Sequence, residues 1–243
     1  GILGLVESVS RLEKIKDIAM TTNGALLEKM AVPLRKSGLH RVNISLDTLN
    51  EKKFRDVTRT GELSEVIRGV EAAKNAGLGV KFNVVLMKDF NDDEIMDLIE
   101  LTRIYDADVR FIELMPIGEN QGYAKANFMA CEEILKVAEL RPVESDDPHA
   151  PTRYYRYGNA KGRVGFITAL SSHFCGDCNR IRLTSDGKLK PCLHSNQEID
   201  LRSAIRRSED LGEIISAAIK SKPEKHYLSE NRIIDRGMSR IGG

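Results

Sequence analysis

The sequence predicts an α/β fold: a parallel sheet, open or curled into part of a barrel, followed by a second domain of different character. Short β-branched runs alternate with helix-like stretches over the first half of the 243 residues, and the second half breaks this alternation. The composition, 41% hydrophobic and 30% charged, is that of a globular protein. We place the boundary near residue 120, giving domains 1–120 and 121–243.

Four strand-like runs and four helix-like stretches build the predicted first domain. Gly38 and Gly77 end two of the helices, and Asn91 is the predicted N-cap of a third. Because a helix separates each pair of consecutive strands, we expect right-handed crossovers and parallel pairing. The expected strands are residues 18–22, 42–46, 80–87 and 109–115, and the expected helices are 1–12, 25–37, 63–75 and 92–105.

Charged residues inside two of these strands are unexpected. Strands covered on both faces are nearly all apolar, yet Lys81 and Arg110 lie within them. A buried charge costs several kcal/mol unless it is paired. Either an internal ion pair with Asp47 or Glu113 or an anionic ligand explains the two cations. Strict alternation places Arg110 and Met115 on opposite faces of the fourth strand, a conflict if both contact a ligand, so either a bulge intervenes or only one of them points inward.

The second half is less regular. Residues 127–140 have the pattern of an amphipathic helix, with Cys131 on its apolar stripe, so we expect this thiol to pack in a core. Residues 141–156 form a polar stretch with three prolines, and 163–170 resemble a strand. Two further helices are expected over 201–207 and 210–221.

Three cysteines carry the sharpest chemical signal. Cys175, Cys178 and Cys192 have the spacing C-x2-C-x13-C, which is typical of a ligand set. A structural zinc site would add His194 or His173 as its fourth ligand. An iron–sulfur cluster bound by three cysteines would keep one iron open, and unliganded thiols are a third alternative. Spacing alone favours zinc.

The residues between these cysteines suggest a hairpin. Asp186-Gly187 predicts a two-residue turn, which brings Cys192 opposite Ile181. Arg180 and Arg182 lie two apart on one strand face beside the second cysteine. Such a pair can grip phosphate oxygens, although a solvated face is the alternative.

Charge and hydropathy exclude several functions. With 37 Lys+Arg against 36 Asp+Glu, the net charge of +1 argues against a protein built to coat nucleic acid. No apolar run approaches the roughly 18 residues of a membrane helix, so we expect a cytoplasmic protein without a membrane partner. The oligomeric state stays open, with a homodimer among the alternatives.

Six motifs follow one another along the chain. They are Thr-Thr-Asn-Gly from Thr21, Asn-Ile-Ser-Leu-Asp from Asn43, Val-Lys-Phe-Asn from Val80, Arg-Phe-Ile-Glu-Leu-Met from Arg110, Phe-Cys-Gly-Asp-Cys-Asn-Arg-Ile-Arg from Phe174 with Cys192, and the terminal Gly242-Gly243. In register, these motifs resemble the GTP 3′,8-cyclases, the radical S-adenosylmethionine (SAM) family also called molybdenum cofactor biosynthesis protein A. The resemblance runs from about residue 15 to the end of the chain.

The resemblance implies a fold and a reaction. The fold is a partial (βα) barrel of the radical SAM type, with four of the family's six βα units, and a C-terminal α+β iron–sulfur domain. The reaction converts GTP to (8S)-3′,8-cyclo-7,8-dihydroguanosine 5′-triphosphate, through a 5′-deoxyadenosyl radical made from SAM at an N-terminal [4Fe-4S] cluster. Cyclic pyranopterin monophosphate synthase, the next enzyme of the pathway, takes the product.

The resemblance also implies roles for individual residues. It assigns Cys175, Cys178 and Cys192 to an auxiliary [4Fe-4S] cluster whose open iron binds guanine, which reverses the zinc preference. It assigns a double-glycine tail, Gly242 and Gly243, to the active site. The GTP contacts it implies are Thr21, Lys81, Arg110, Arg180 and Arg182, and the SAM contacts are Ser45 and Met115.

One departure from the family is large. The C-x3-C-x2-C motif that binds the SAM-cleaving cluster is absent, since no cysteine precedes Cys131. We expect a fragment that cannot complete the reaction alone, and SAM-dependent consumption of GTP by the pure protein would refute this. The alternative is a non-catalytic, metal-containing module that binds GTP or phosphate.

Overall fold

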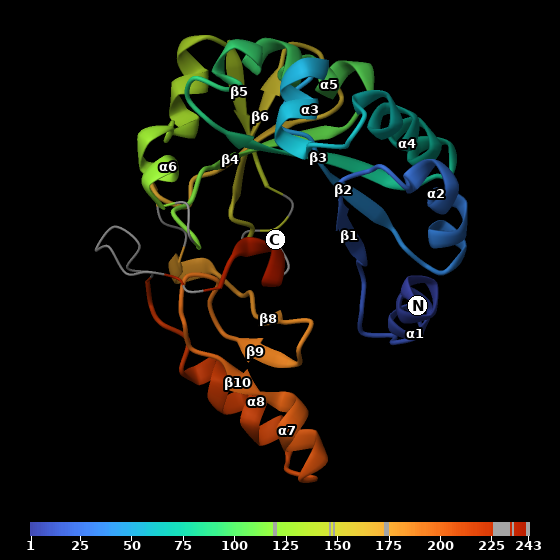
Figure 1. Cartoon of the computed structure of the whole chain (residues 1–243), viewed down its shortest axis with the longest axis vertical. Helices are drawn as coiled ribbons and strands as arrows, with labels where there is room; N and C mark the ends of the chain where they lie inside the picture. Colours follow the sequence, from blue (N-terminus) through green and yellow to red (C-terminus); the bar gives the residue numbers. More distant parts are fainter. Residues whose placement is uncertain are drawn as a thin grey trace. The chain divides into compact units, whose positions relative to one another are not determined.

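The computed structural model describes residues 1–118, 121–145, 147, 149–172, 175–225, 234 and 236–241 (Figure 1). Contacts divide the chain into two compact units. The first comprises Gly1–Glu113, Met129–Ser145 and Thr152–Ile167, and the second Leu114–Phe128, Asp146–Pro151 and Thr168–Gly243. This division differs from the predicted boundary near residue 120, because three strands after that residue extend the N-terminal sheet.

A mixed sheet forms the centre of the first unit. Its described strands follow the order β1-β2-β3-β4-β7-β6-β5, with parallel pairing from β1 to β7 and antiparallel pairing from β7 to β5. The four predicted strands and their parallel pairing are confirmed. The strands are β1 Ala19–Thr22, β2 Arg41–Ser45, β3 Gly79–Leu86, β4 Asp108–Glu113, β5 Leu140–Val143, β6 Thr152–Tyr157 and β7 Val164–Ile167.

Helices of the first unit connect the parallel strands. The predicted helix over 63–75 is confirmed at both ends, whereas α3 was not predicted and begins at Asn50, whose side chain accepts from the amides of Lys52 and Lys53. The helices are α1 Ile2–Ser10, α2 Leu27–Lys36, α3 Glu51–Thr58, α4 Leu63–Asn75, the 3₁₀ turn η1 Asp92–Glu94 and α5 Ile95–Ile104.

Asn91 does not cap the helix that follows it, which corrects one prediction. Its side chain is fully buried and bonds backbone instead, with Oδ1 accepting from Met87 N and Nδ2 donating to the carbonyls of Asp47 and Val85. Asn91 therefore ties together the chain segments that leave β2 and β3. The helix it precedes opens as the 3₁₀ turn η1.

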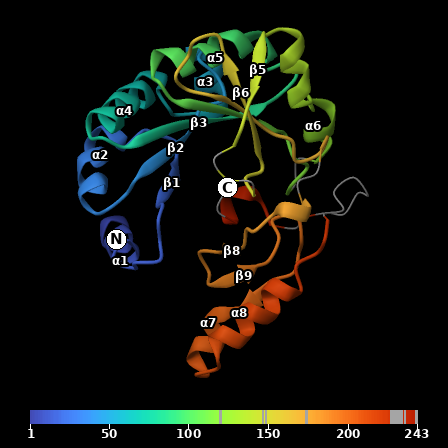
Figure 2. The same cartoon turned by 180° about the vertical axis from the view of Figure 1, so that it is seen from behind.

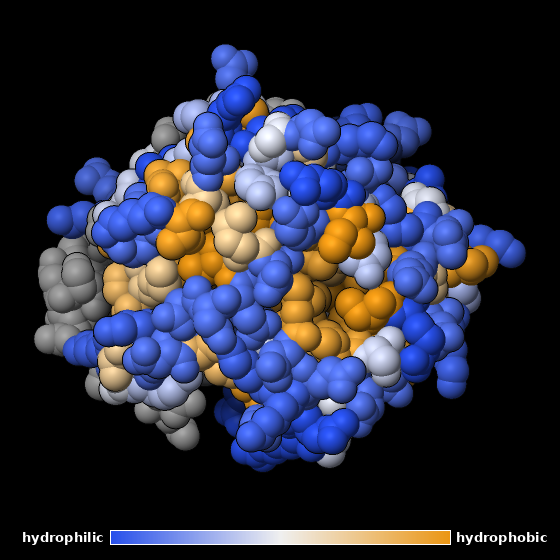
Figure 3. All heavy atoms as spheres, turned by 90° about the horizontal axis from the view of Figure 1, so that it is seen from above, coloured by the Kyte–Doolittle hydropathy of each residue, from blue (hydrophilic) through white to orange (hydrophobic). Residues whose placement is uncertain are grey.

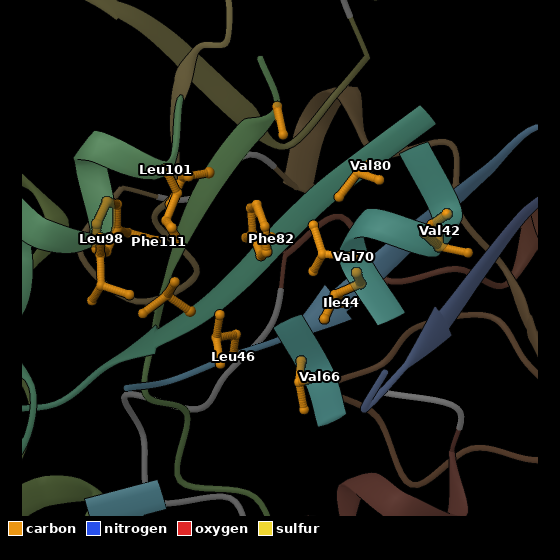
Figure 4. Close-up of a cluster of buried hydrophobic side chains, with 14 of the residues drawn as sticks. Val42, Ile44, Leu46, Val66, Val70, Val80, Phe82, Leu98, Leu101 and Phe111 are labelled. Carbon is orange, nitrogen blue, oxygen red and sulfur yellow. The ribbon is translucent and has the colours of Figure 1, made fainter. Parts of the chain in front are cut away.

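The core lies on one face of this sheet. Alternate residues of β2, β3 and β4 point toward α4 and α5, where Phe82 and Phe111 are fully buried (Figure 4). Burying a side chain of this size contributes about 1.5–3 kcal/mol. The opposite face therefore carries the remaining residues of each strand, including the unexpected polar ones.

Residues 127–157 correct two predictions. The expected amphipathic helix over 127–140 is only a 3₁₀ segment, η2 Cys131–Lys136, followed by β5. The expected polar stretch contains β5 and β6, which pair as an antiparallel ribbon at the end of the sheet. Pro142 is tolerated in β5 because an outermost strand leaves one row of amides unpaired.

The second unit contains a small three-stranded sheet of order β10-β9-β8, packed on two helices (Figure 2). Leu189, Leu201 and Ala218 form a buried apolar cluster between this sheet and the helices. The predicted helix start at Asp210 is confirmed, since its carboxylate accepts from Gly212 N and Glu213 N. The elements are α6 Gln121–Ala126, η3 Cys175–Asp177, β8 Arg182–Leu183, β9 Lys188–Lys190, β10 Ile199–Asp200, α7 Leu201–Arg206, α8 Leu211–Lys220 and η5 Met238–Arg240.

The predicted hairpin is present, but its register differs by one residue. Arg182 pairs with Lys190, and Thr184 bonds Lys188, so three residues rather than two form the turn. Gly187 adopts φ +83°, the left-handed conformation that closes three-residue turns. If this register is extended beyond the paired residues, Cys192 no longer lies opposite Ile181, where it was predicted to lie.

Within the described part of the chain, no helix has the length and apolar character needed to cross a membrane. The face of the molecule in Figure 3 is mostly hydrophilic, with hydrophobic side chains showing in groups between the polar ones.

Candidate functional site

The polar face of the large sheet brings the predicted residues of the first unit together. Strand register places Thr21, Asn43, Lys81 and Asp108 in one row across β1 to β4. A second row, two residues nearer the carboxyl ends of the strands, contains Ser45, Asn83, Arg110 and Gly165. Side chains two apart along a strand share a face, so both rows lie on the side opposite the core.

Lys81 belongs to an ion-pair network in the first row. Its ammonium lies 3.0 Å from the carboxylate of Asp108 and 3.5 Å from the hydroxyl of Tyr154. The same carboxylate also lies 3.0 Å from the guanidinium of Arg163. The predicted partners were Asp47 and Glu113. That prediction is wrong for Lys81, because Asp108 is its register neighbour, whereas burial shows Glu113 on the core face.

The network favours the charged form of Asp108. Burial alone would raise the pKa of this carboxyl, but hydrogen bonds and charge from Arg163 and Lys81 outweigh burial and lower it. The Arg163 guanidinium also stacks 4.0 Å from the ring centre of Tyr154. Two cations and one anion therefore leave this network with an excess positive charge.

Arg110 is held in the second row by two amide oxygens. Its Nε donates to Asn83 at 3.0 Å, and its Nη2 donates to Asn43 at 2.8 Å. Gly165 makes room for this side chain, since an added Cβ there would lie 3.1 Å from Arg110 Cγ. β4 ends at Glu113, so strand alternation does not govern Met115, and the conflict between Arg110 and Met115 disappears.

The second unit brings the three predicted cysteines to one cavity. Cys175, Cys178 and Cys192 are free thiols, each half-buried. They line one cavity together with Arg180, Arg182, His194, Lys222, Leu193, Pro223 and Lys225. The two predicted arginines and the three predicted cysteines therefore share one cavity.

The charges around the cavity favour anionic groups. Burial would raise the pKa of Cys178, but the amide of Arg180 and the ammonium of Lys222 lower it. The pKa of Cys192 is raised, chiefly by burial. Burial and the neighbouring Arg180 lower the pKa of Arg182, so an anion close to this guanidinium would stabilise its charged form.

The three cysteine thiols are of the ligand type that an iron–sulfur cluster requires. Among the described residues no three His, Cys, Asp or Glu side chains converge as ligands of one metal ion, and His194 Nε2 lies 3.1 Å from Met115 Sδ. A cluster differs because each thiolate binds a different iron, so the sulfurs need not converge on one point. His173, the other predicted zinc ligand, lies outside the described residues.

Two further predictions have different outcomes. Cys131 packs in the core as expected: it is fully buried, its Sγ lies 3.5 Å from the carbonyl of Phe111, and burial raises its pKa strongly. Gly242 and Gly243 lie outside the described residues, so the role of the double-glycine tail stays a prediction.

Sequence reasoning missed Asp108, Arg163, Tyr154 and Lys222. Asp108 and Arg163 each stand at the edge of an apolar run, where a charged residue normally marks a strand end. Lys222 lies 44 residues from Cys178, and its only signal was a Lys-Pro pair after an amphipathic helix. Register and tertiary contact, rather than local pattern, bring these residues to the two sites.

Family models and individual relatives match this chain over nearly its whole length. A family described as Radical SAM superfamily matches residues 2–102, and one described as Molybdenum Cofactor Synthesis C matches residues 107–228. The chain is 51% identical to the GTP 3′,8-cyclase of Alkaliphilus oremlandii and 50% identical to that of Alkaliphilus metalliredigens, with 100% of the chain and 77% of each relative aligned. The GTP 3′,8-cyclase of Peptoclostridium acidaminophilum is 47% identical, with 76% of it aligned.

Proposed function

Because the chain belongs to the GTP 3′,8-cyclase family, we propose that it acts in the radical SAM conversion of GTP to (8S)-3′,8-cyclo-7,8-dihydroguanosine 5′-triphosphate. This product is the precursor of cyclic pyranopterin monophosphate in molybdenum cofactor biosynthesis. The observation that carries the proposal is the shared cavity of Cys175, Cys178, Cys192, Arg180 and Arg182. It combines ligands for an iron–sulfur cluster with donors for a phosphate.

We propose that the three cysteines hold the auxiliary [4Fe-4S] cluster. Thiolates are the ligands such clusters require, and the ammonium of Lys222 beside Cys178 favours the thiolate form. When bound, the cluster would supply an open iron as a binding position for guanine. Arg180 and Arg182 then donate to oxygens of the same nucleotide, because their guanidiniums line the same cavity.

The polar face of the sheet supplies the remaining GTP contacts in this proposal. Lys81 and Arg110 offer positive charge to phosphate oxygens, and the Thr21 hydroxyl lies in the same row as Lys81. Arg110 is pre-organised by its two amide partners, so little side-chain entropy remains to be lost on binding. Ser45 and Met115 remain the proposed SAM contacts.

The proposed architecture is a partial radical SAM barrel with four of six βα units and a C-terminal α+β iron–sulfur domain. The parallel order β1-β2-β3-β4 with its connecting helices supports the partial barrel. The small sheet with α7 and α8 supports the α+β description of the C-terminal part. The division into domains 1–120 and 121–243 stays a prediction.

The first experiment is the iron, sulfide and zinc content of the protein after anaerobic reconstitution. We expect about four irons with matching sulfide per chain, as one [4Fe-4S] cluster requires. Cys175→Ser should abolish iron binding. One zinc without iron would contradict the proposal and favour a non-catalytic phosphate-binding module.

Binding of GTP gives the second measurement. The cluster-loaded protein should bind GTP more tightly than the apoprotein, because the open iron adds a ligand bond to the phosphate contacts. Equal affinity with and without the cluster would mean that the cavity doesn't position the nucleotide on the cluster.

A further inference from the structure

Lys222 lies two residues beyond the end of α8 and contacts the cysteine segment at three points. Its ammonium donates to the carbonyl of Cys178 and, at 2.9 Å, to the carbonyl of Arg180. It also lies 3.3 Å from Cys178 Sγ. An ammonium has three donor hydrogens, so these three acceptors match its hydrogen-bonding capacity.

The end of α8 is itself firmly placed. Ala218 is almost fully buried against the small sheet, where it packs with Leu189 and Leu201. Ser221 Oγ accepts from Gln197 Nε2 at 3.1 Å, which joins the helix end to the segment after Cys192. Two consecutive residues, Ser221 and Lys222, thus contact the chain on both sides of the 182–190 hairpin.

The contacts to the 178–180 backbone matter because this loop carries two of the residues that line the cavity. Cys178 is half-buried and Arg180 is exposed, and both line the cavity, although the loop between η3 and β8 has no regular secondary structure. Hydrogen bonds from a charged donor are stronger than those between neutral groups, so Lys222 can fix a loop that lacks strand or helix bonds.

We propose that Lys222 is a positioning residue for the cysteine centre: it fixes the backbone between Cys178 and Arg180 and donates a charge-assisted hydrogen bond to the Cys178 sulfur. This inference rests on the proposed function, because it treats Cys178 as a cluster ligand. A positive donor at a ligand sulfur stabilises the added negative charge of the reduced cluster. Lys222 therefore raises the reduction potential of the auxiliary cluster and slows its loss.

The test compares three variants of the full chain after anaerobic reconstitution. Lys222→Met removes the charge and the donors while keeping the length of the side chain, and Lys222→Arg keeps both. Lys220→Met is the matched control, since Lys220 ends the same helix but is exposed. The readouts are the midpoint potential of the cluster and the rate of iron loss to an external chelator.

We expect Lys222→Met to lower the midpoint potential and to speed iron loss about 10- to 100-fold, the usual effect of removing an outer contact of a metal ligand. Lys222→Arg should restore most of both, and Lys220→Met should match the wild type. The potential is measured on clusters that have assembled, so a lower yield of folded variant doesn't obscure it.

Two results would overturn the inference. One is a Lys222→Met protein whose potential and iron loss equal those of the wild type. The other is an equal change in Lys220→Met, which would show a general charge effect of the helix end. If the wild type itself takes up no iron, the proposed function fails, and that result is read before any variant is compared.

Discussion

Replacing Asp108 with Asn should destabilise the protein markedly, because this carboxylate separates two cations on the polar face of the sheet. Lys81 and Arg163 each lie 3.0 Å from it. The exposed fraction of the side chain is only 22% for Lys81, 16% for Arg163 and 12% for Asp108. At an effective dielectric constant near 20, each contact at this distance is worth about 5 kcal/mol before desolvation. Removing one partner from a buried ion pair costs about 3–5 kcal/mol.

We therefore expect Asp108→Asn to lower the free energy of unfolding by about 3 kcal/mol at pH 7, measured by urea denaturation. Asp106→Asn is the matched control. Its ion pair with Lys161 has the same 3.0 Å distance, but the two side chains are 43% and 79% exposed, so the loss should stay below about 1 kcal/mol. Equal losses in the two variants would refute the reasoning.

The pH dependence of the same pair gives an independent check. The pKa of Asp108 is lowered in the folded state, so its contribution to stability is complete above the unfolded-state value of about 3.9 and is lost as the pH falls through the folded value. The difference between wild type and Asp108→Asn should shrink below about pH 4. A difference that stays constant from pH 7 to pH 3 would contradict the assigned ion pair.

Three further substitutions test other parts of the structure. Arg182→Ala should weaken GTP binding by about 1.5–3 kcal/mol in a titration. Arg206→Ala is the control, since Arg206 is exposed, and should leave binding unchanged. Equal affinities of the two variants would mean that Arg182 does not contact the nucleotide. Cys131→Ser should leave the iron content unchanged because this thiol packs in the core, and a loss of iron would identify it as a ligand. Gly165→Ala should lower the free energy of unfolding by about 1–3 kcal/mol, since its Cβ would lie 2.5 Å from the nearest side-chain atom; Gly4→Ala, with open space around it, should show no loss, and a similar stability for both would mean that the sheet adapts.

The apolar periodicity of the sequence predicted the helices and strands that bury one face. Residues 63–75 were predicted as a helix with both ends correct, because the apolar period is regular and Gly77 follows it at φ +76°. α3 was missed because Phe54 and Val57 are its only apolar side chains, and of these only Phe54 is buried. β5 and β6 were missed because residues 141–156 read as a polar stretch with three prolines, whereas an outermost strand of a sheet tolerates Pro142.

Residues of the candidate site were predicted where residue type and spacing are distinctive. The cysteines and arginines of the cavity were found because metal ligands and phosphate donors have recognisable spacing. The partner of Lys81 was not found, since strand register decides that Asp108 rather than Asp47 faces it. Lys222 was beyond local pattern, because only tertiary packing brings α8 to the cysteine segment.

The division of the chain into units has a consequence for dissecting the protein. The chain passes between the two units five times, after residues 113, 128, 145, 151 and 167. An expression fragment ending at residue 120 would lose β7, the strand that pairs with β4, and would expose a new hydrogen-bonding edge. A fragment ending after Ile167 keeps all the strands of the large sheet described here and is the better choice for studying that sheet by itself.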